Sequence, residues 1–143
     1  MEFDRAKFTA FVAKNVEDKA TREAIFDLLR FSLENASKVL GGEDNKTFHY
    51  VVSARDGSHM LFYCDSSGGV EIKLSKFPQL APSAVSQFVR KLGTLSPGFN
   101  YVLRLEDRRT TQGFSINATL VDPTIMKQFQ TAILKLQDQI YRA

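Results

Sequence analysis

Apolar residues recur at helical spacing in two segments near the start of the chain. In residues 4–16, Phe8, Phe11, Val12 and Val16 share one side, which predicts an amphipathic helix. A second, longer stripe begins near Thr21, and its members are Ile25, Leu28, Leu29, Ala36, Val39 and Leu40. The Gly41-Gly42 pair then predicts the end of this helix, because glycine adopts the left-handed conformation of a helix C-terminus without steric cost.

After residue 46 the apolar pattern changes to the alternation of a strand. Residues 47–54 and 58–64 are two such segments, and the Asp56-Gly57 pair between them is a signal for a tight hairpin. Residues 70–75 alternate strictly, with apolar and charged or hydroxyl side chains on opposite sides. Three consecutive strands with one polar face predict an antiparallel meander that is covered on one side only.

The second half of the chain predicts two more helices and a strand pair. Pro82 opens an apolar stripe over residues 82–92, and Gly93 follows it. Residues 99–105 and 114–121 have strand patterns and are joined by a polar turn. Asp122-Pro123 supplies a cap and a proline at the first helical position, so a final helix is expected to run to about Tyr141.

The predicted order of elements is α-α-β-β-β-α-β-β-α. We therefore expect an α+β fold with a five-stranded, mainly antiparallel sheet and helices packed on one face of it. Neither a linker nor an internal repeat interrupts the 143 residues, so we expect a single domain over 1–143. Within it, residues 1–20 form a helical extension and residues 21–143 form the core.

Composition and charge place the chain among cytoplasmic globular proteins. There are 12 Phe and no Trp, which indicates a well-filled core. Cys64 is the sole cysteine, so no disulfide forms within the chain, and the charged first residues lack the apolar run of an export signal. We also expect no membrane span. The formal net charge of +3 is mild, with both signs interspersed, and favours a solvated surface over a dedicated nucleic-acid binder.

The order of elements after the first helix resembles that of the small chaperones of type III secretion systems, the Tir chaperone family, and of the related YbjN-like domains. The resemblance covers roughly residues 21–143 and lies in topology, spacing and length. Its clearest segments are the proline-opened SAVSQFVRKL and the final VDPTIMKQFQTAILKLQDQIY. The family has no invariant catalytic or ligand motif. The resemblance implies a bacterial homodimer that binds an extended segment of a partner protein and has no enzymatic activity.

One spacing in the chain fits an enzyme. Asp56 is followed on a later strand by Glu71 and Lys73, a pattern similar to that of metal-dependent nucleases of the PD-(D/E)xK type. In such a site, Asp and Glu on adjacent strands hold Mg²⁺ while the lysine positions the attacking water. The alternative explanation is that Asp56 belongs to a turn, whereas Glu71 and Lys73 occupy the solvated face of an antiparallel strand.

The remaining polar candidates concern metal and phosphate binding. His49 and His59 lie on neighbouring predicted strands, but zinc requires a third or fourth ligand, and Cys64 has the opposite strand parity to His59. We interpret the two histidines as ordinary strand residues and Cys64 as a small core residue. A basic patch near the second hairpin is an alternative site for nucleic-acid phosphates. Its members are Lys73, Arg104, Arg108 and Arg109.

The second half of the chain has a surplus of apolar residues that we do not expect one domain to bury in full. A contiguous apolar remainder marks a protein interface, and two-fold pairing is its commonest form. The residues expected at this partner or dimer interface are Val85, Phe88, Val89, Tyr101 and Leu103. We expect a non-enzymatic, chaperone- or adaptor-like domain that binds another protein and uses no cofactor. The alternatives are a nucleic-acid-associated protein and the nuclease.

Overall fold

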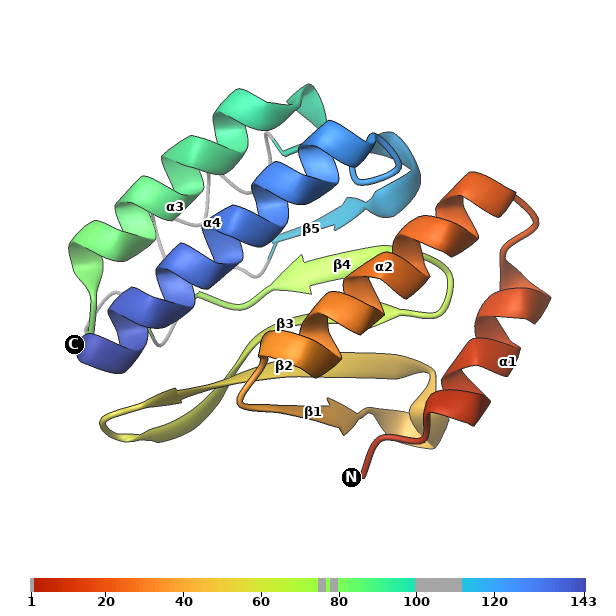
Figure 1. Ribbon diagram of the computed structural model, residues 1–143, viewed down its shortest axis with the longest axis horizontal. Coiled ribbons are helices and arrows are strands. Elements are labelled where there is room, and N and C mark those ends of the chain that lie inside the picture. The colour runs from red at the N-terminus through yellow and green to blue at the C-terminus, as the bar shows by residue number, and fades with distance from the viewer. Residues whose placement is uncertain (1, 75–76, 78–79, 100–111) are drawn as a thin grey trace.

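The computed structural model describes residues 2–74, 77, 80–99 and 112–143. Within these ranges the chain forms a five-stranded sheet with helices on one of its faces (Figure 1). The helices are α1 (Arg5–Asn15), α2 (Lys19–Asn35), α3 (Pro82–Leu95) and α4 (Pro123–Arg142). The strands are β1 (Lys38–Gly41), β2 (Thr47–Ala54), β3 (Gly57–Asp65), β4 (Gly69–Ile72) and β5 (Gln112–Ser115).

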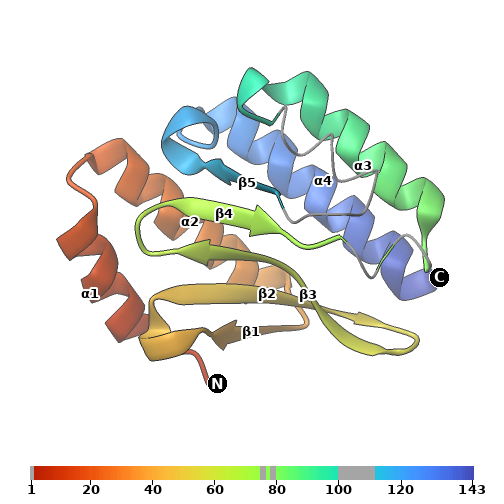
Figure 2. The same cartoon turned by 180° about the vertical axis from the view of Figure 1, so that it is seen from behind.

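The sheet follows the chain in the simplest possible order. Its strands are arranged β1-β2-β3-β4-β5, and every neighbouring pair is antiparallel. The predicted α+β class and the antiparallel sheet are thus confirmed. Helices α2, α4 and α3 cover one face, whereas no helix lies in front of the strands in the view from behind (Figure 2).

The predicted meander is present, with a small shift at its first turn. Ala54 pairs with Gly57, so the two-residue loop is Arg55-Asp56 instead of Asp56-Gly57. Gly57 opens β3 with a φ of 124°, a backbone conformation that other residues adopt only with strain. The hairpin signal was therefore correct, and the glycine serves the strand that leaves the turn.

The second helix is shorter than its apolar stripe predicts. Helix α2 ends at Asn35, and residues 38–41 form β1, so the expected helical end at Gly41-Gly42 is wrong. The N–H of Ser37 donates to the carbonyl of Val51, and Lys38–Gly41 continues this pairing along β2. Unpaired backbone groups at a strand edge are costly. The pairing with β1 gives the backbone groups of β2 partners that a longer α2 would not provide.

The strand predicted at 114–121 is also shortened. Only its first residues belong to β5, and a 3₁₀ turn, Ile116–Ala118, follows. The Thr119 hydroxyl donates to the carbonyl of Ser115, a local bond by which short polar side chains compete with strand pairing. The predicted strand 99–105 lies outside the described residues except for Phe99, which ends a 3₁₀ turn and is buried.

Aspartates begin three of the helices. The carboxylates of Asp4, Asp18 and Asp122 each accept a backbone N–H in the first turn of the helix that follows. Hydrogen bonds from the side chain and the backbone of Thr21 hold the pKa of Asp18 below its ordinary value. Among the described residues, no helix combines the length and apolar character needed to cross a membrane.

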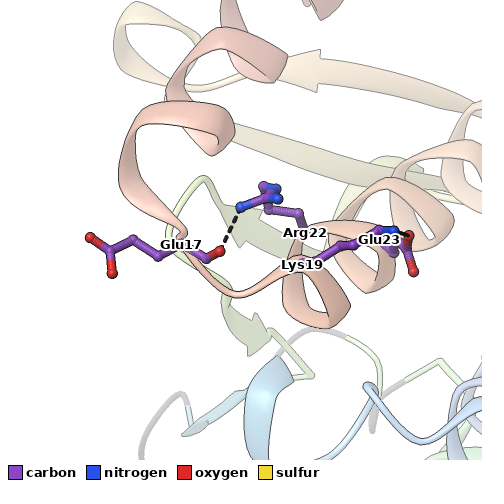
Figure 3. Close-up of polar contacts among 4 residues, drawn as sticks. All are labelled: Glu17, Lys19, Arg22 and Glu23. Carbon is purple, nitrogen blue, oxygen red and sulfur yellow. Dashed lines mark hydrogen bonds and ion pairs between the residues drawn. The ribbon is translucent and has the colours of Figure 1, made fainter.

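Helix α1 is attached to the same core as the other helices. The side chains of Phe8 and Val12 are fully buried, and the Phe8 ring meets the Phe48 ring edge-on at 5.3 Å. At the junction with α2, the Arg22 guanidinium donates to the carbonyls of Val16 and Glu17 at 2.9 and 2.7 Å. Figure 3 shows this side chain extended toward Glu17. These carbonyls at the end of α1 are therefore satisfied by a side chain of α2.

Aromatic rings fill the space between the sheet and the helices. Tyr50 of β2 stacks on Phe62 of β3 at 4.9 Å and on Phe31 of α2 at 5.9 Å between ring centroids. Its hydroxyl donates to the side-chain oxygen of Gln137 on α4, whose amide donates to the carbonyl of Asn35. The sheet, α4 and the end of α2 are joined in this way.

Candidate functional site

The residues of the predicted nuclease site lie at different ends of the sheet. Asp56 occupies the exposed β2–β3 turn, and its carboxylate lies 2.7 Å from Nε2 of His59. Glu71 is opposite Tyr63 on β3, and the strand from Gly57 to Tyr63 separates it from the turn by about 20 Å. The two carboxylates therefore do not meet. Within the described ranges, no group of three or more His, Cys, Asp or Glu residues is placed to hold a metal.

Glu71 and Lys73 belong instead to a cluster on the helix-free face of the sheet. The Lys73 ammonium lies 5.6 Å from the centre of the Tyr63 ring on β3. The centre of the His49 ring, on β2, lies 5.7 Å from the centre of the same tyrosine ring. Burial, followed by a hydrogen bond with Glu71, raises the pKa of Tyr63 to about 12. Burial is also the main cause that lowers the pKa of His49. At neutral pH the phenol therefore keeps its proton and the imidazole is uncharged.

The two histidines and the cysteine do not converge. His49 is opposite Tyr63 in the register of the sheet, whereas His59 is opposite Val52. His49 lies 3.1 Å from the Thr47 hydroxyl. Cys64 is fully buried, and burial raises the pKa of its thiol well above the ordinary value. Such a thiol stays protonated and is unsuited to act as a nucleophile.

The predicted basic patch and interface are only partly within the described residues. Arg104, Arg108, Arg109, Tyr101 and Leu103 lie outside them. The three α3 residues of the predicted interface are 4% exposed or less, so most of their surface faces the protein's own core. These residues are Val85, Phe88 and Val89. Helix α4 packs directly beside α3 (Figure 1).

A groove between α3 and α4 is the candidate functional site. The two helices run antiparallel and side by side on the outer surface of the helical layer (Figure 1). Pro82 and the Asp122 cap fix their starts, and the buried stripes of both helices face the sheet. The space left between their outer sides has a volume of about 780 Å³. On α3 it extends from Ala84 to Thr94, a length of about 15 Å.

The floor of the groove is apolar. It is formed by side chains that are also part of the core or pack against it, so it is held rigidly. Two of these side chains are alanines, one on each helix. Because alanine is small, these positions leave the space above the floor open. The floor residues are Ala84, Phe88, Ala132 and Leu136.

The walls of the groove are polar and carry positive charge only. Residues spaced one helical turn apart form each wall, and nearly all are exposed. Within the described part of the chain, no Asp or Glu lines the groove. The α3 wall consists of Gln87, Arg90, Lys91 and Thr94, and the α4 wall consists of Lys127, Gln128, Thr131, Lys135 and Gln139.

Sequence reasoning identified Phe88 of this site but not the lysines. A signal was nevertheless present, because residues 82–95 contain no acidic residue and residues 123–142 contain only Asp138. The corresponding charges of α2 are mixed, with Glu23 and Asp27 beside Lys19 and Arg30. What the sequence did not show is that the two acid-poor helices lie next to each other.

Comparison of the chain with models of known protein families, with curated proteins and with solved structures found no match. The function is therefore argued from the fold and from the groove.

Proposed function

We propose that this chain is a non-enzymatic protein-binding domain, of chaperone or adaptor type, that holds a helical segment of a partner polypeptide between α3 and α4. The observation that supports this proposal is the apolar floor of the groove, which is open to the surface between two polar walls. An amphipathic helix binds such a groove by placing apolar residues at i, i+3/i+4 and i+7 on the floor. The groove's length suits about three turns of such a helix.

The resemblance to secretion chaperones also implies polypeptide binding, but it was based on three strands before α3, and the structure has four. The proposal therefore rests on the groove. The alternative enzyme has less support, because Asp56 and Glu71 are separated by much of β3. The proposed function needs neither a metal nor a proton-transfer group. It needs an apolar surface on a rigid support. The half-buried Ala132 is the most exposed part of the floor, and Phe88 and Leu136 hold the floor in place by their packing in the core.

Filling the groove tests the function. In Ala132→Phe, a half-buried alanine on the floor is replaced by a ring that projects into the space a partner would use. Ala10→Phe adds the same ring on the exposed side of α1 and is the matched control. Both variants are first checked for unchanged circular dichroism and thermal unfolding.

Wild-type protein and both variants are immobilised and exposed to lysate of the source cells after nuclease treatment. We expect a small set of polypeptides to bind the wild type and Ala10→Phe and to be lost with Ala132→Phe. If all three proteins retain the same polypeptides, the groove is not the binding site and the proposed function is wrong.

A further inference from the structure

We infer that the partner helix is acidic: its apolar stripe is flanked on both sides by Glu or Asp. This inference rests on the proposed function and specifies the chemistry of the ligand. It is carried by the placement of Arg90 and Lys91 on one wall of the groove and Lys127 and Lys135 on the other.

Among the residues that the structure describes, no acidic side chain forms an ion pair with these four cations. The ion pairs found among the described residues involve other side chains, and the groove lining contains no carboxylate. All four side chains are exposed, so they are free to turn toward a ligand. A helix on the floor would place its flanking residues beside both walls. Carboxylates at those flanks would be attracted to the cations, and lysines would be repelled.

A second copy of this chain fits the groove less well. Two-fold pairing of the groove with itself would bring the cations of both copies together. Helix α2 of another copy also lacks the required charge, because its Glu23 and Asp27 already pair with Lys19 and Arg30. The charge of the walls therefore favours a different, acidic chain.

Nucleic acid fits the walls but not the floor. Phosphates would be attracted to the lysines, but bases would meet Ala84, Ala132 and the buried Phe88, whose ring is not presented for stacking. Apolar side chains of a helix would instead pack into the groove against the part of the floor that is still exposed, chiefly the half-buried Ala132. The combination of an apolar floor with cationic walls is complementary to an amphipathic acidic helix.

Two synthetic peptides of roughly 18 residues serve as probes, a length that covers the groove with a turn or more to spare. They share one leucine stripe, and the flanking positions are Glu in one and Lys in the other. Each carries a fluorescent label, and binding to the full chain is measured by anisotropy in about 50 and about 300 mM NaCl. Exposed charges are screened much more strongly at the higher salt concentration.

We expect the Glu peptide to bind at least about tenfold more tightly than the Lys peptide at low salt. Each exposed ion pair is weak, but the attractions on both walls of the groove act together. The double variant Lys91→Glu/Lys135→Glu leaves two cations and two carboxylates on the walls and should abolish this preference. The control Lys7→Glu/Lys14→Glu makes the same change in net charge on exposed positions of α1 and should leave it unchanged.

The remaining outcomes separate this inference from the proposed function. If both peptides bind equally and Ala132→Phe abolishes binding of both, the groove binds helices and the acidic preference is wrong. If neither peptide binds, both the inference and the groove as a helix site are overturned. A labelled single-stranded oligonucleotide that competes with the Glu peptide, and binds more tightly than it at low salt, also overturns the inference in favour of phosphate recognition.

Discussion

The hydroxyl of Tyr50 is the point at which the sheet is hydrogen-bonded to the helical layer. It donates to Gln137 on α4, and the Gln137 amide donates in turn to the carbonyl of Asn35 at 3.0 Å. Tyr50 is fully buried and Gln137 is half-buried, so water has poor access to this acceptor. Tyr50→Phe removes the hydroxyl while the ring and its stacking on Phe62 and Phe31 remain.

We expect Tyr50→Phe to lower the free energy of unfolding by about 1–2 kcal/mol. A buried acceptor left without its donor costs roughly 1–3 kcal/mol, and the partial exposure of Gln137 places this loss in the lower part of that range. The measurement is urea unfolding followed by far-ultraviolet circular dichroism. The midpoint reports stability as long as the m value is the same in both proteins.

Tyr63→Phe is the matched control, because it removes a hydroxyl from a half-buried tyrosine whose ring contacts are His49 and Lys73. We expect it to change stability by no more than about 0.5 kcal/mol. Combining Tyr50→Phe with Gln137→Met should cost less than the sum of the two single changes, because both partners of the bond are then absent. Equal losses in Tyr50→Phe and Tyr63→Phe, or strict additivity in the double variant, would refute the reasoning.

Four further predictions follow from buried or capping groups. The free energy of unfolding should fall as the pH rises above about 10, the ordinary pKa of tyrosine. The fold raises the pKa of Tyr50 and Tyr63, so both stay protonated in the native state while the unfolded chain loses these protons. In urea titrations, Tyr50→Phe should show a smaller loss of stability over this pH range. On the acid side, the fold lowers the pKa of His49. The contribution of the neutral imidazole to stability is therefore complete above about pH 6.5 and is lost as the pH falls through the pKa of His49 in the folded state. The urea midpoint of His49→Gln should accordingly depend less on pH between about 7 and 5. Cys64 should react with a thiol reagent such as Ellman's only at the rate of unfolding, and rapid labelling of the native protein would contradict its burial. Asp122→Ala should cost about 1 kcal/mol through loss of the α4 cap, whereas Asp122→Asn should cost little, as measured by thermal unfolding.

Local signals were sufficient for most of the fold. The starts of α3 and α4 were predicted from Pro82 and Asp122-Pro123, because these residues act on the adjacent turn alone. The β2–β3 hairpin was likewise predicted from alternation and a glycine turn. Each of these features is decided within a few residues of the chain.

The errors occurred where a distant strand decided the outcome. Val39 and Leu40 continue the spacing of the α2 stripe, but they also suit a strand, and β2 offers a partner for that strand. Val39 pairs with Tyr50 and Leu40 with His49 in the sheet. Spacing within the segment contains no information about this pairing, so the helix was predicted to extend too far.

The groove shows how a small net charge of the whole chain can coexist with a cluster of positive charge on one surface of the fold. The formal net charge of +3 was interpreted as evenly spread and therefore as a property of a solvated surface. Four of the 19 basic residues line the α3–α4 groove, however, and the remaining ones are slightly outnumbered by the 16 acidic residues. The groove thus holds a local concentration of positive charge that the value for the whole chain does not indicate. A mild net charge is consistent with a strong local preference when two acid-poor helices, distant in sequence, are packed side by side over the same sheet.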